Sequence, residues 1–151
     1  MTLTQKETAF LQDLKGQEEL CIAKYEKYRT SAHDKTLSGL FGTIKSAEES
    51  HLQTVSGILN GENPTAKTPP TAQSQSFIGE PSGCSEAEKQ EDAYLCRDAL
   101  SMEKHVSALY DTSIFEFTEP PLRDVLSHIQ KEEQNHGEQL YQYLSLNNLY
   151  Q

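Results

Sequence analysis

The chain has 151 residues, a length typical of one domain with a single hydrophobic core. Its 23 Asp and Glu residues outnumber its 13 Lys and Arg residues, and the resulting charge of -10 argues against a nucleic-acid or anionic-membrane surface. No apolar run of 18 residues occurs, and the opening MTLTQKETAF does not resemble a secretory signal. We therefore expect no membrane span and synthesis in the cytosol.

Two helices are predicted within residues 1–60, where apolar residues recur at helical spacing. TQKE at residues 4–7 is a capping-box signature, a Thr cap with a Glu three residues later, for a helix that runs to about Arg29. Asp34 can cap a second helix, which we expect to end at the Asn-Gly pair 60–61. Together these helices form a first hairpin.

Residues 61–84, GENPTAKTPPTAQSQSFIGEPSGC, are rich in Pro, Gly, Ser and Thr and predict a long connection. A second hairpin is predicted over residues 85–151. SEAE at residues 85–88 repeats the capping-box signature, and Thr118, followed by a Glu and two prolines, fits the first turn of the fourth helix. We therefore expect an all-α fold, an antiparallel four-helix bundle of two similar hairpins joined by a long crossover linker, with residues 1–151 forming one domain.

The two hairpins match each other without a gap at an offset of 85 residues. Identical pairs include Glu18 with Glu103, Tyr25 with Tyr110, Leu37 with Leu122, Ile44 with Ile129, Glu48 with Glu133, His51 with His136 and Leu59 with Leu144. Apolar positions of any two bundle helices tend to align, whereas agreement at Glu, Glu and His is more specific. This repeat predicts that one hairpin packs against a second, similar one.

Four glutamates occupy positions where the helical pattern calls for core residues: Glu18, Glu48, Glu103 and Glu133. Four buried, unpaired carboxylates would repel each other, and each would lose several kcal/mol of hydration free energy. We therefore expect cations to neutralise them, and two divalent metal ions would do so.

Two of these glutamates begin a Glu-x-x-His motif, Glu48 with His51 and Glu133 with His136. Residues three apart lie nearly on one face of a helix, so both can reach the same ion. Four carboxylates and two imidazoles are the ligand set of ferritin-like di-iron and di-manganese proteins. The sequence thus predicts a ferritin-like bundle with two divalent ions, Fe or Mn, with Zn as a substitute. The predicted site contains no cysteine, which argues against a thiolate zinc centre.

Other polar residues lie close to the predicted ligands. We expect the following neighbours on the surface, or in the case of the histidines as capping residues: Glu19, Glu49, Glu132, His33, His105 and His128. Tyr25 and Tyr110 each follow a core glutamate by seven residues. Their hydroxyls are candidates to hydrogen-bond the metal ligands; the alternative is a core tyrosine whose hydroxyl is satisfied elsewhere.

Three cysteines, Cys21, Cys84 and Cys96, are odd in number and have no C-x-x-C spacing. This argues against a disulfide framework and a zinc knuckle. We expect reduced thiols, with Cys84 the most exposed, and the sequence assigns none of them a role.

The segments LTQKETAFLQDLKGQEELCIAKYEKY and LFGTIKSAEESHLQTVSGILNG, and most specifically YLCRDALSMEKHVSALYDTSIFEF and LRDVLSHIQKEEQNHGEQLYQYL, resemble the Coat F family of ferritin-like spore-coat proteins. The resemblance implies a ferritin-like bundle, expression during sporulation, and localisation to the spore coat after synthesis in the cytoplasm of the sporulating cell. Other spore-coat proteins are the implied partners, and a homodimer is a candidate assembly. In the wider ferritin-like superfamily, the di-metal ligands match by position Glu18, Glu48, His51, Glu103, Glu133 and His136.

Two classes of function stay open. A structural spore-coat protein would use metal mainly to hold its helices together, and its seven tyrosines and Cys84 are candidate cross-linking groups. A di-metal oxidoreductase acting on peroxide or dioxygen, similar to rubrerythrin-like peroxidases or manganese catalases, would use the metal pair for two-electron chemistry. No rubredoxin-type cysteine pairs are present to deliver electrons, so a peroxidase would need an external donor. Iron storage is a third and weaker hypothesis.

Overall fold

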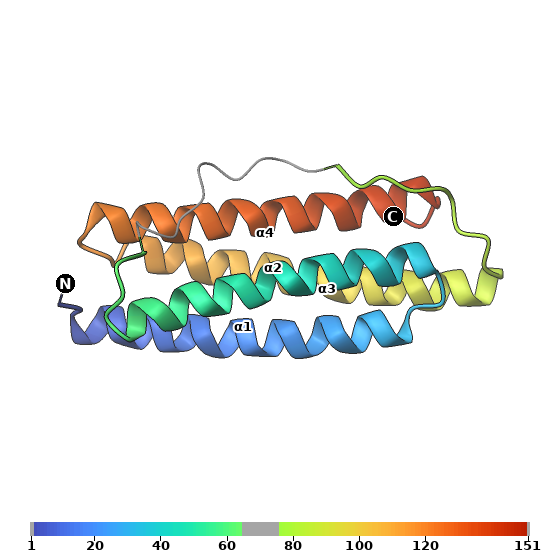
Figure 1. The fold of residues 1–151 in the computed structure, drawn as a ribbon. Helices are drawn as coiled ribbons and strands as arrows, with labels where there is room; N and C mark the ends of the chain where they lie inside the picture. Colours follow the sequence, from blue (N-terminus) through green and yellow to red (C-terminus); the bar gives the residue numbers. More distant parts are fainter. Residues whose placement is uncertain (1, 65–75, 151) are drawn as a thin grey trace.

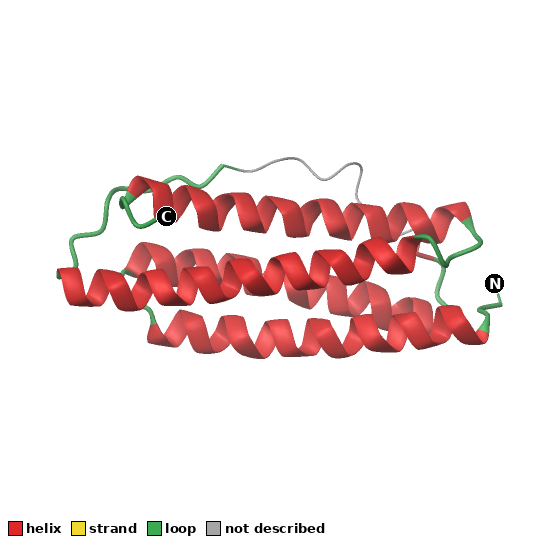
Figure 2. Cartoon of the chain, turned by 180° about the vertical axis from the view of Figure 1, so that it is seen from behind, coloured by secondary structure: helices red, strands yellow, loops and turns green. Residues whose placement is uncertain are grey.

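The computed structural model describes residues 2–64 and 76–150, and four long helices dominate it (Figure 1). They are α1 Gln5–Ser31, α2 Lys35–Leu59, α3 Glu86–Ile114 and α4 Pro120–Leu146. No strand occurs in the described ranges (Figure 2). The predicted all-α fold and four-helix bundle are confirmed, while residues 65–75 of the predicted linker lie outside the described residues.

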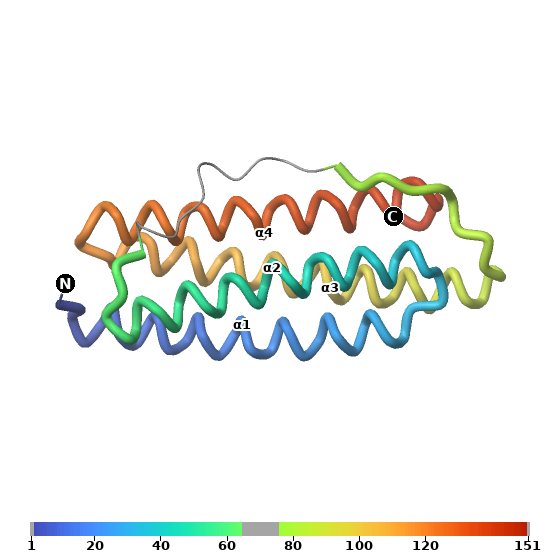
Figure 3. The backbone as a smooth tube through the Cα atoms, in the orientation of Figure 1, coloured from blue at the N-terminus to red at the C-terminus, as the bar shows by residue number. Residues whose placement is uncertain are grey.

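Each hairpin consists of two helices packed along their length, α1 with α2 and α3 with α4, and α1 also contacts α3 while α2 contacts α4. In Figure 3, α1 and α4 run in one direction and α2 and α3 in the other, so each of these contacting pairs is antiparallel. The end of α2 and the start of α3 lie at opposite ends of the bundle. The chain therefore crosses the length of the bundle between the two hairpins.

The described end of the linker, residues 76–84, follows the C-terminal part of α4 (Figure 1). The Phe77 ring packs edge-on against Tyr143, with ring centroids 5.6 Å apart. The N–H of Ser82 donates to Oδ1 of Asn147 at 2.7 Å. These contacts hold the chain against α4 just before α3 begins.

Three helices begin at the local signals that the sequence contains. The capping boxes of Thr4 with Glu7 and of Ser85 with Glu88 are both complete. The Asp34 side chain accepts from a backbone N–H in the first turn of α2 at 3.0 Å. Because each cap and its partner lie within four consecutive residues, these starts depend on local chemistry and not on packing.

The start of α4 differs from the prediction. Glu119 is the N-cap and makes no side-chain cap bond, so Thr118 lies outside the helix. The N–H and the hydroxyl of Thr118 instead both donate to Oε1 of Glu7, each at 3.0 Å. Glu7 is only 2 % exposed, and its other oxygen closes the capping box of α1. One carboxylate thus joins the start of α1 to the turn before α4.

Polar contacts also join the two hairpins at the opposite end of the bundle. Asp92 of α3 is fully buried and accepts from the backbone N–H groups of His33 at 2.8 Å and Asp34 at 2.9 Å. The hydroxyl of Tyr143 in α4 donates to Asp34 at 2.7 Å. The turn between α1 and α2 is therefore fastened to both helices of the second hairpin.

The interior of the bundle is mainly aliphatic and aromatic. Its largest fully buried side chains include Leu11, Leu14, Phe41, Leu126 and Leu140. Of the helices in the described residues, none combines the length and the apolar character needed to cross a membrane. The exception to this apolar packing is a layer of glutamates and histidines near the middle of the helices.

Candidate metal centre

The six predicted ligands come from all four helices and meet near the middle of the bundle. α1 and α3 contribute one glutamate each, and α2 and α4 contribute one Glu-x-x-His motif each: Glu18, Glu103, Glu48 with His51, and Glu133 with His136. Their exposed fractions run from 0 % for Glu18 and Glu48 to 6 % for His136. The structure therefore brings the whole predicted set together and removes it from water.

These side chains form two overlapping groups. One donor atom from each of Glu18, Glu48, His51 and Glu133 lies within 4.8 Å of the others, and the same holds for Glu48, Glu103, Glu133 and His136. Glu48 and Glu133 belong to both groups. Each group also has one glutamate and one histidine of its own. Two neighbouring ions that shared two carboxylates would fit this pattern.

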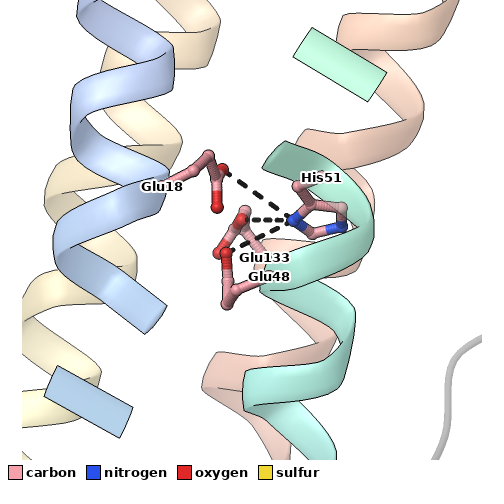
Figure 4. Close-up of side chains that lie close together, drawn as sticks. All are labelled: Glu18, Glu48, His51 and Glu133. Carbon is pink, nitrogen blue, oxygen red and sulfur yellow. Dashed lines mark hydrogen bonds and ion pairs between the residues drawn. The ribbon is translucent and has the colours of Figure 1, made fainter. Parts of the chain in front are cut away.

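In the first group, three carboxylates lie on one side of the His51 ring (Figure 4). Its Nδ1 atom lies 3.0 Å from Oε1 of Glu133 and 3.3 Å from Oε2 of Glu48. Oε1 of Glu18 is 3.9 Å from the same nitrogen. Carboxylates from three helices thus converge on Nδ1, while Nε2 points away from them (Figure 4).

In the second group, three carboxylates lie near Nδ1 of His136 in the same way. Its Nδ1 atom lies 3.1 Å from Oε1 of Glu48, 3.4 Å from Oε1 of Glu103 and 3.7 Å from Oε2 of Glu133. The rings of His51 and His136 are stacked at 25°, with centroids 6.0 Å apart. The two halves of the centre therefore repeat each other, as the sequence offset indicates.

Two buried tyrosines hydrogen-bond the glutamates that are not shared. Tyr110 of α3 donates to Oε1 of Glu18 at 2.6 Å, and Tyr25 of α1 donates to Oε1 of Glu103 at 2.5 Å. Both tyrosines are fully buried. Each hydroxyl therefore fixes the orientation of a carboxylate on the facing helix.

The four carboxyl groups have very different proton affinities. Burial and the adjacent Glu48 raise the pKa of Glu18 to about 11, and burial with the adjacent Glu133 raises the pKa of Glu103 to about 8. Burial also disfavours the charge of Glu48, but hydrogen bonds with Glu18 and both imidazoles lower its pKa to about 2. The pKa of Glu133 is lowered by similar hydrogen bonds, against the effects of burial and of Glu48. The shared glutamates are therefore the ionised ones.

The surroundings of both imidazoles favour their protonated form. Burial lowers the pKa of His51 and of His136, but the surrounding carboxylates outweigh it and raise each pKa well above its usual value. At neutral pH, two imidazolium ions thus balance the two shared carboxylates, while Glu18 and Glu103 hold protons. Metal ligands must be deprotonated, so an entering metal ion would take the place of these protons.

The donor atoms fit divalent metal ions. Among the described residues, one carboxylate oxygen of each glutamate is buried and makes no hydrogen bond of good geometry, although Nδ1 of His136 lies 3.1 Å from the Glu48 oxygen. These oxygens are Oε2 of Glu18, Oε1 of Glu48, Oε2 of Glu103 and Oε2 of Glu133. A buried oxygen without a donor is costly unless a cation or a proton satisfies it. Mixed carboxylate and imidazole ligands suit Fe and Mn. The six residues therefore have the chemistry to hold two such ions.

The structure corrects the expected positions of Glu132 and His128. The Glu132 side chain is 30 % exposed, with Oε2 3.5 Å from Nε2 of His51. Its other oxygen is 2.7 Å from Nε2 of His128, whose side chain is 12 % exposed. His128 and Glu132 are four residues apart, which is the spacing of an ion pair on one face of a helix, and the sequence could have indicated their contact. The remaining neighbours are exposed as expected: Glu19, His33, Glu49 and His105.

All three cysteines have free thiols, and Cys84 is the least buried of them. Cys21 is 2 % exposed, and burial together with the four nearby carboxylates raises the pKa of its thiol. Its sulfur belongs to neither of the two groups of donor atoms. The Cys21 thiol therefore stays protonated and packs beside the centre without belonging to it.

A family model described as the Coat F domain matches residues 91–151, which include most of α3 and all of α4. The match contains Glu103, Glu133 and His136 and covers less than half of the chain. The first hairpin lies outside it. No curated protein and no solved structure shows significant similarity to the chain.

Proposed function

We propose that this chain is a spore-coat-associated protein with a ferritin-like bundle whose core binds two divalent metal ions, Fe or Mn, with Zn as a substitute. The observation that carries the metal centre is the pair of buried donor groups that share Glu48 and Glu133. In a bundle with an apolar interior, four carboxylates and two imidazoles at one level need a cationic partner or bound protons.

Each ion would have one glutamate and one histidine of its own. Glu18 and His51 would hold one ion, Glu103 and His136 the other, and the shared Glu48 and Glu133 would contact both. A bound pair of Fe or Mn ions would supply two-electron chemistry with peroxide or dioxygen. The protein's contribution is to keep the site buried and to direct two tyrosine hydroxyls at the unshared glutamates.

The Coat F match supports the spore coat as the place of action and other coat proteins as partners. The exposed tyrosines offer groups for contact or cross-linking in such an assembly: Tyr94, Tyr141 and Tyr150. A homodimer is the simplest assembly to test. Detection of the tagged protein in coat fractions of spores, and its absence from vegetative cells, would support this localisation; recovery in vegetative cytoplasm alone would contradict it.

The deciding experiment for the metal centre is a count of bound ions. The purified protein is stripped with a chelator, reloaded anaerobically with Fe(II) or Mn(II), and analysed for metal per chain. About two ions per chain, lost in Glu133→Ala, support the centre. If the protein binds no ion, the buried cluster is part of the scaffold and its charge is balanced by protons alone.

A di-metal oxidoreductase is the second candidate, because a donor set of carboxylates and imidazoles without a thiolate suits redox-active Fe or Mn. The test is the decay of hydrogen peroxide with the Mn-loaded protein, and with the Fe-loaded protein plus an external reductant. Metal-dependent turnover that disappears in Glu133→Ala would establish an enzyme. Two bound ions without turnover would favour a structural role of the metal.

A further inference from the structure

The two halves of the centre differ at the outer side of the histidine rings. On the His51 side, Nε2 lies 3.5 Å from Oε2 of Glu132, and Oε1 of Glu132 lies 2.7 Å from Nε2 of His128. Both are ion-pair contacts, and neither nitrogen makes a hydrogen bond of good geometry in the described part of the chain. These three residues form a chain of contacts from the buried ring to the partly exposed face of α4.

The other half has no such chain of contacts. The offset of 85 residues that relates the ligands places Ala47 opposite Glu132 and Thr43 opposite His128. The Ala47 side chain has no acceptor, and the Thr43 hydroxyl is used within α2, where it donates to the carbonyl of Gly39 at 3.1 Å. No described residue makes a hydrogen bond or ion pair with Nε2 of His136.

A carboxylate beside Nε2 of a histidine affects how Nδ1 of the same ring binds a metal ion. In both halves Nδ1 faces the carboxylates, so it is the nitrogen that is placed to bind a metal ion. A neutral, metal-binding imidazole then carries its proton on Nε2. A carboxylate facing that proton fixes the tautomer and the ring orientation and makes the ligand more basic. Only the His51 ring has such a carboxylate among the described residues.

We propose that Glu132, held in place by His128, is a positioning residue for His51, and that it makes the Glu18–His51 position the tighter of two unequal metal positions. The inference rests on the proposed metal centre. The two ions then bind in sequence, the first at the Glu18–His51 position and the second at the Glu103–His136 position. Outer carboxylates of this kind are worth about 10- to 100-fold in metal affinity.

Calorimetric titration of the metal-free protein with Mn(II) under anaerobic conditions tests the order of binding. The parent should show two steps with dissociation constants about 10- to 100-fold apart. Glu132→Gln, which keeps the size of the side chain and removes its charge, should weaken the first step and bring the two steps together. Glu49→Gln, an exposed glutamate beside a ligand, is the matched control and should leave both steps unchanged.

Variants with one remaining position show which half is affected. In a Glu103→Ala background, which retains the Glu18–His51 position, Glu132→Gln should weaken Mn(II) binding about tenfold or more. In a Glu18→Ala background it should have no effect. A purely structural role of Glu132 would weaken both backgrounds alike, and that result overturns the proposal. If neither background binds Mn(II), Glu132→Gln is tested as a single substitution. Weakening of the first step alone then supports the proposal, and equal weakening of both steps overturns it.

Transfer of the contacts to the other half is the complementary test. Ala47→Glu combined with Thr43→His places the same residues opposite His136, and should tighten the second step toward the first. Two ions bound with equal affinity by the parent, or two steps unaffected by Glu132→Gln, overturn this inference while leaving the metal centre intact. A parent protein that binds no Mn(II), Fe(II) or Zn(II) overturns the proposed centre and the inference with it.

Discussion

The hydroxyl of Tyr110 in α3 donates to Oε1 of Glu18 in α1 at 2.6 Å, and the repeat of this contact joins Tyr25 to Glu103 in the reverse direction. Both hydroxyls and both carboxyls lie in the core. Together with the bond from Tyr28 to Asp98, these are the side-chain hydrogen bonds that join α1 and α3 in the described part of the chain. They couple the packing of the two hairpins to the orientation of the unshared glutamates.

Removal of either tyrosine hydroxyl should destabilise the metal-free bundle. Tyr110→Phe leaves a buried oxygen of Glu18 without this donor, and we expect a loss of about 1–3 kcal/mol in the free energy of unfolding. Urea denaturation followed by circular dichroism measures it. Tyr28→Phe is the control, because its partner Asp98 has a side chain that is 38 % exposed and can turn to water. A larger loss for the control would contradict the special role of the central tyrosines.

Substitution of shared and unshared glutamates should change metal stoichiometry differently. Glu48 and Glu133 belong to both donor groups, so Glu48→Ala or Glu133→Ala should weaken both ion positions. Glu18→Ala and Glu103→Ala each affect one group, and we expect about one ion per chain to remain. Metal analysis after anaerobic loading measures the difference.

Glu19→Ala is the control for the stoichiometry series, since Glu19 neighbours a predicted ligand and is exposed. It should retain the full complement of ions. Equal stoichiometry in all five proteins would show that the ligand assignment is wrong, whereas equal loss from shared and unshared variants would contradict the two overlapping groups.

Metal affinity should rise with pH. Glu18, with a pKa of about 11, and Glu103, with a pKa of about 8, hold protons at neutral pH, and the raised pKa values of His51 and His136 add two more. Each proton competes with the metal, so lowering the pH opposes binding and raising it assists. Loading both positions at pH 7 should release about four protons per chain.

Calorimetry in buffers of different ionisation enthalpy counts the protons released on metal binding. Titrations between pH 6 and pH 8 should show tighter binding at the higher value. Binding that is independent of pH over this range would mean that the ligands are already deprotonated in the metal-free protein, which contradicts the proton balance of the cluster.

Local signals in the sequence predicted much of this structure, because their partners lie close along the chain. The capping boxes and the two Glu-x-x-His motifs each span four residues, and two helix starts and the pairing of each Glu with its His follow from them. The sharing of Glu48 and Glu133 between two groups depends on distances between four helices, and no spacing in the sequence contains it. The partner of Thr118 could not be found in this way either, since Glu7 is 111 residues away.

Glu7 should make the bundle sensitive to acid. Burial raises the pKa of Glu7, but hydrogen bonds from the backbone and side chains of Thr4 and Thr118 outweigh it and hold the pKa below its usual value of 4.5. The stabilisation is therefore present above pH 4.5 and is lost as the pH falls through the lowered pKa. Glu7→Ala should cost about 1–3 kcal/mol at pH 7, because it leaves the N–H of Thr118 without its acceptor, and it should reduce the difference in stability between pH 7 and pH 3.

Glu88→Ala is the matched control for Glu7→Ala, because Glu88 closes the same capping box at α3 without a contact to another turn's backbone. Its side chain is 45 % exposed, so water can replace it, and we expect a cost of about 0.5–1 kcal/mol. Urea denaturation of both variants and the parent at pH 7 and pH 3 gives the comparison. Equal costs for the two variants at pH 7 would show that the bond from Thr118 to Glu7 adds nothing to the cap, and that the start of α1 is not fastened to α4 through this carboxylate.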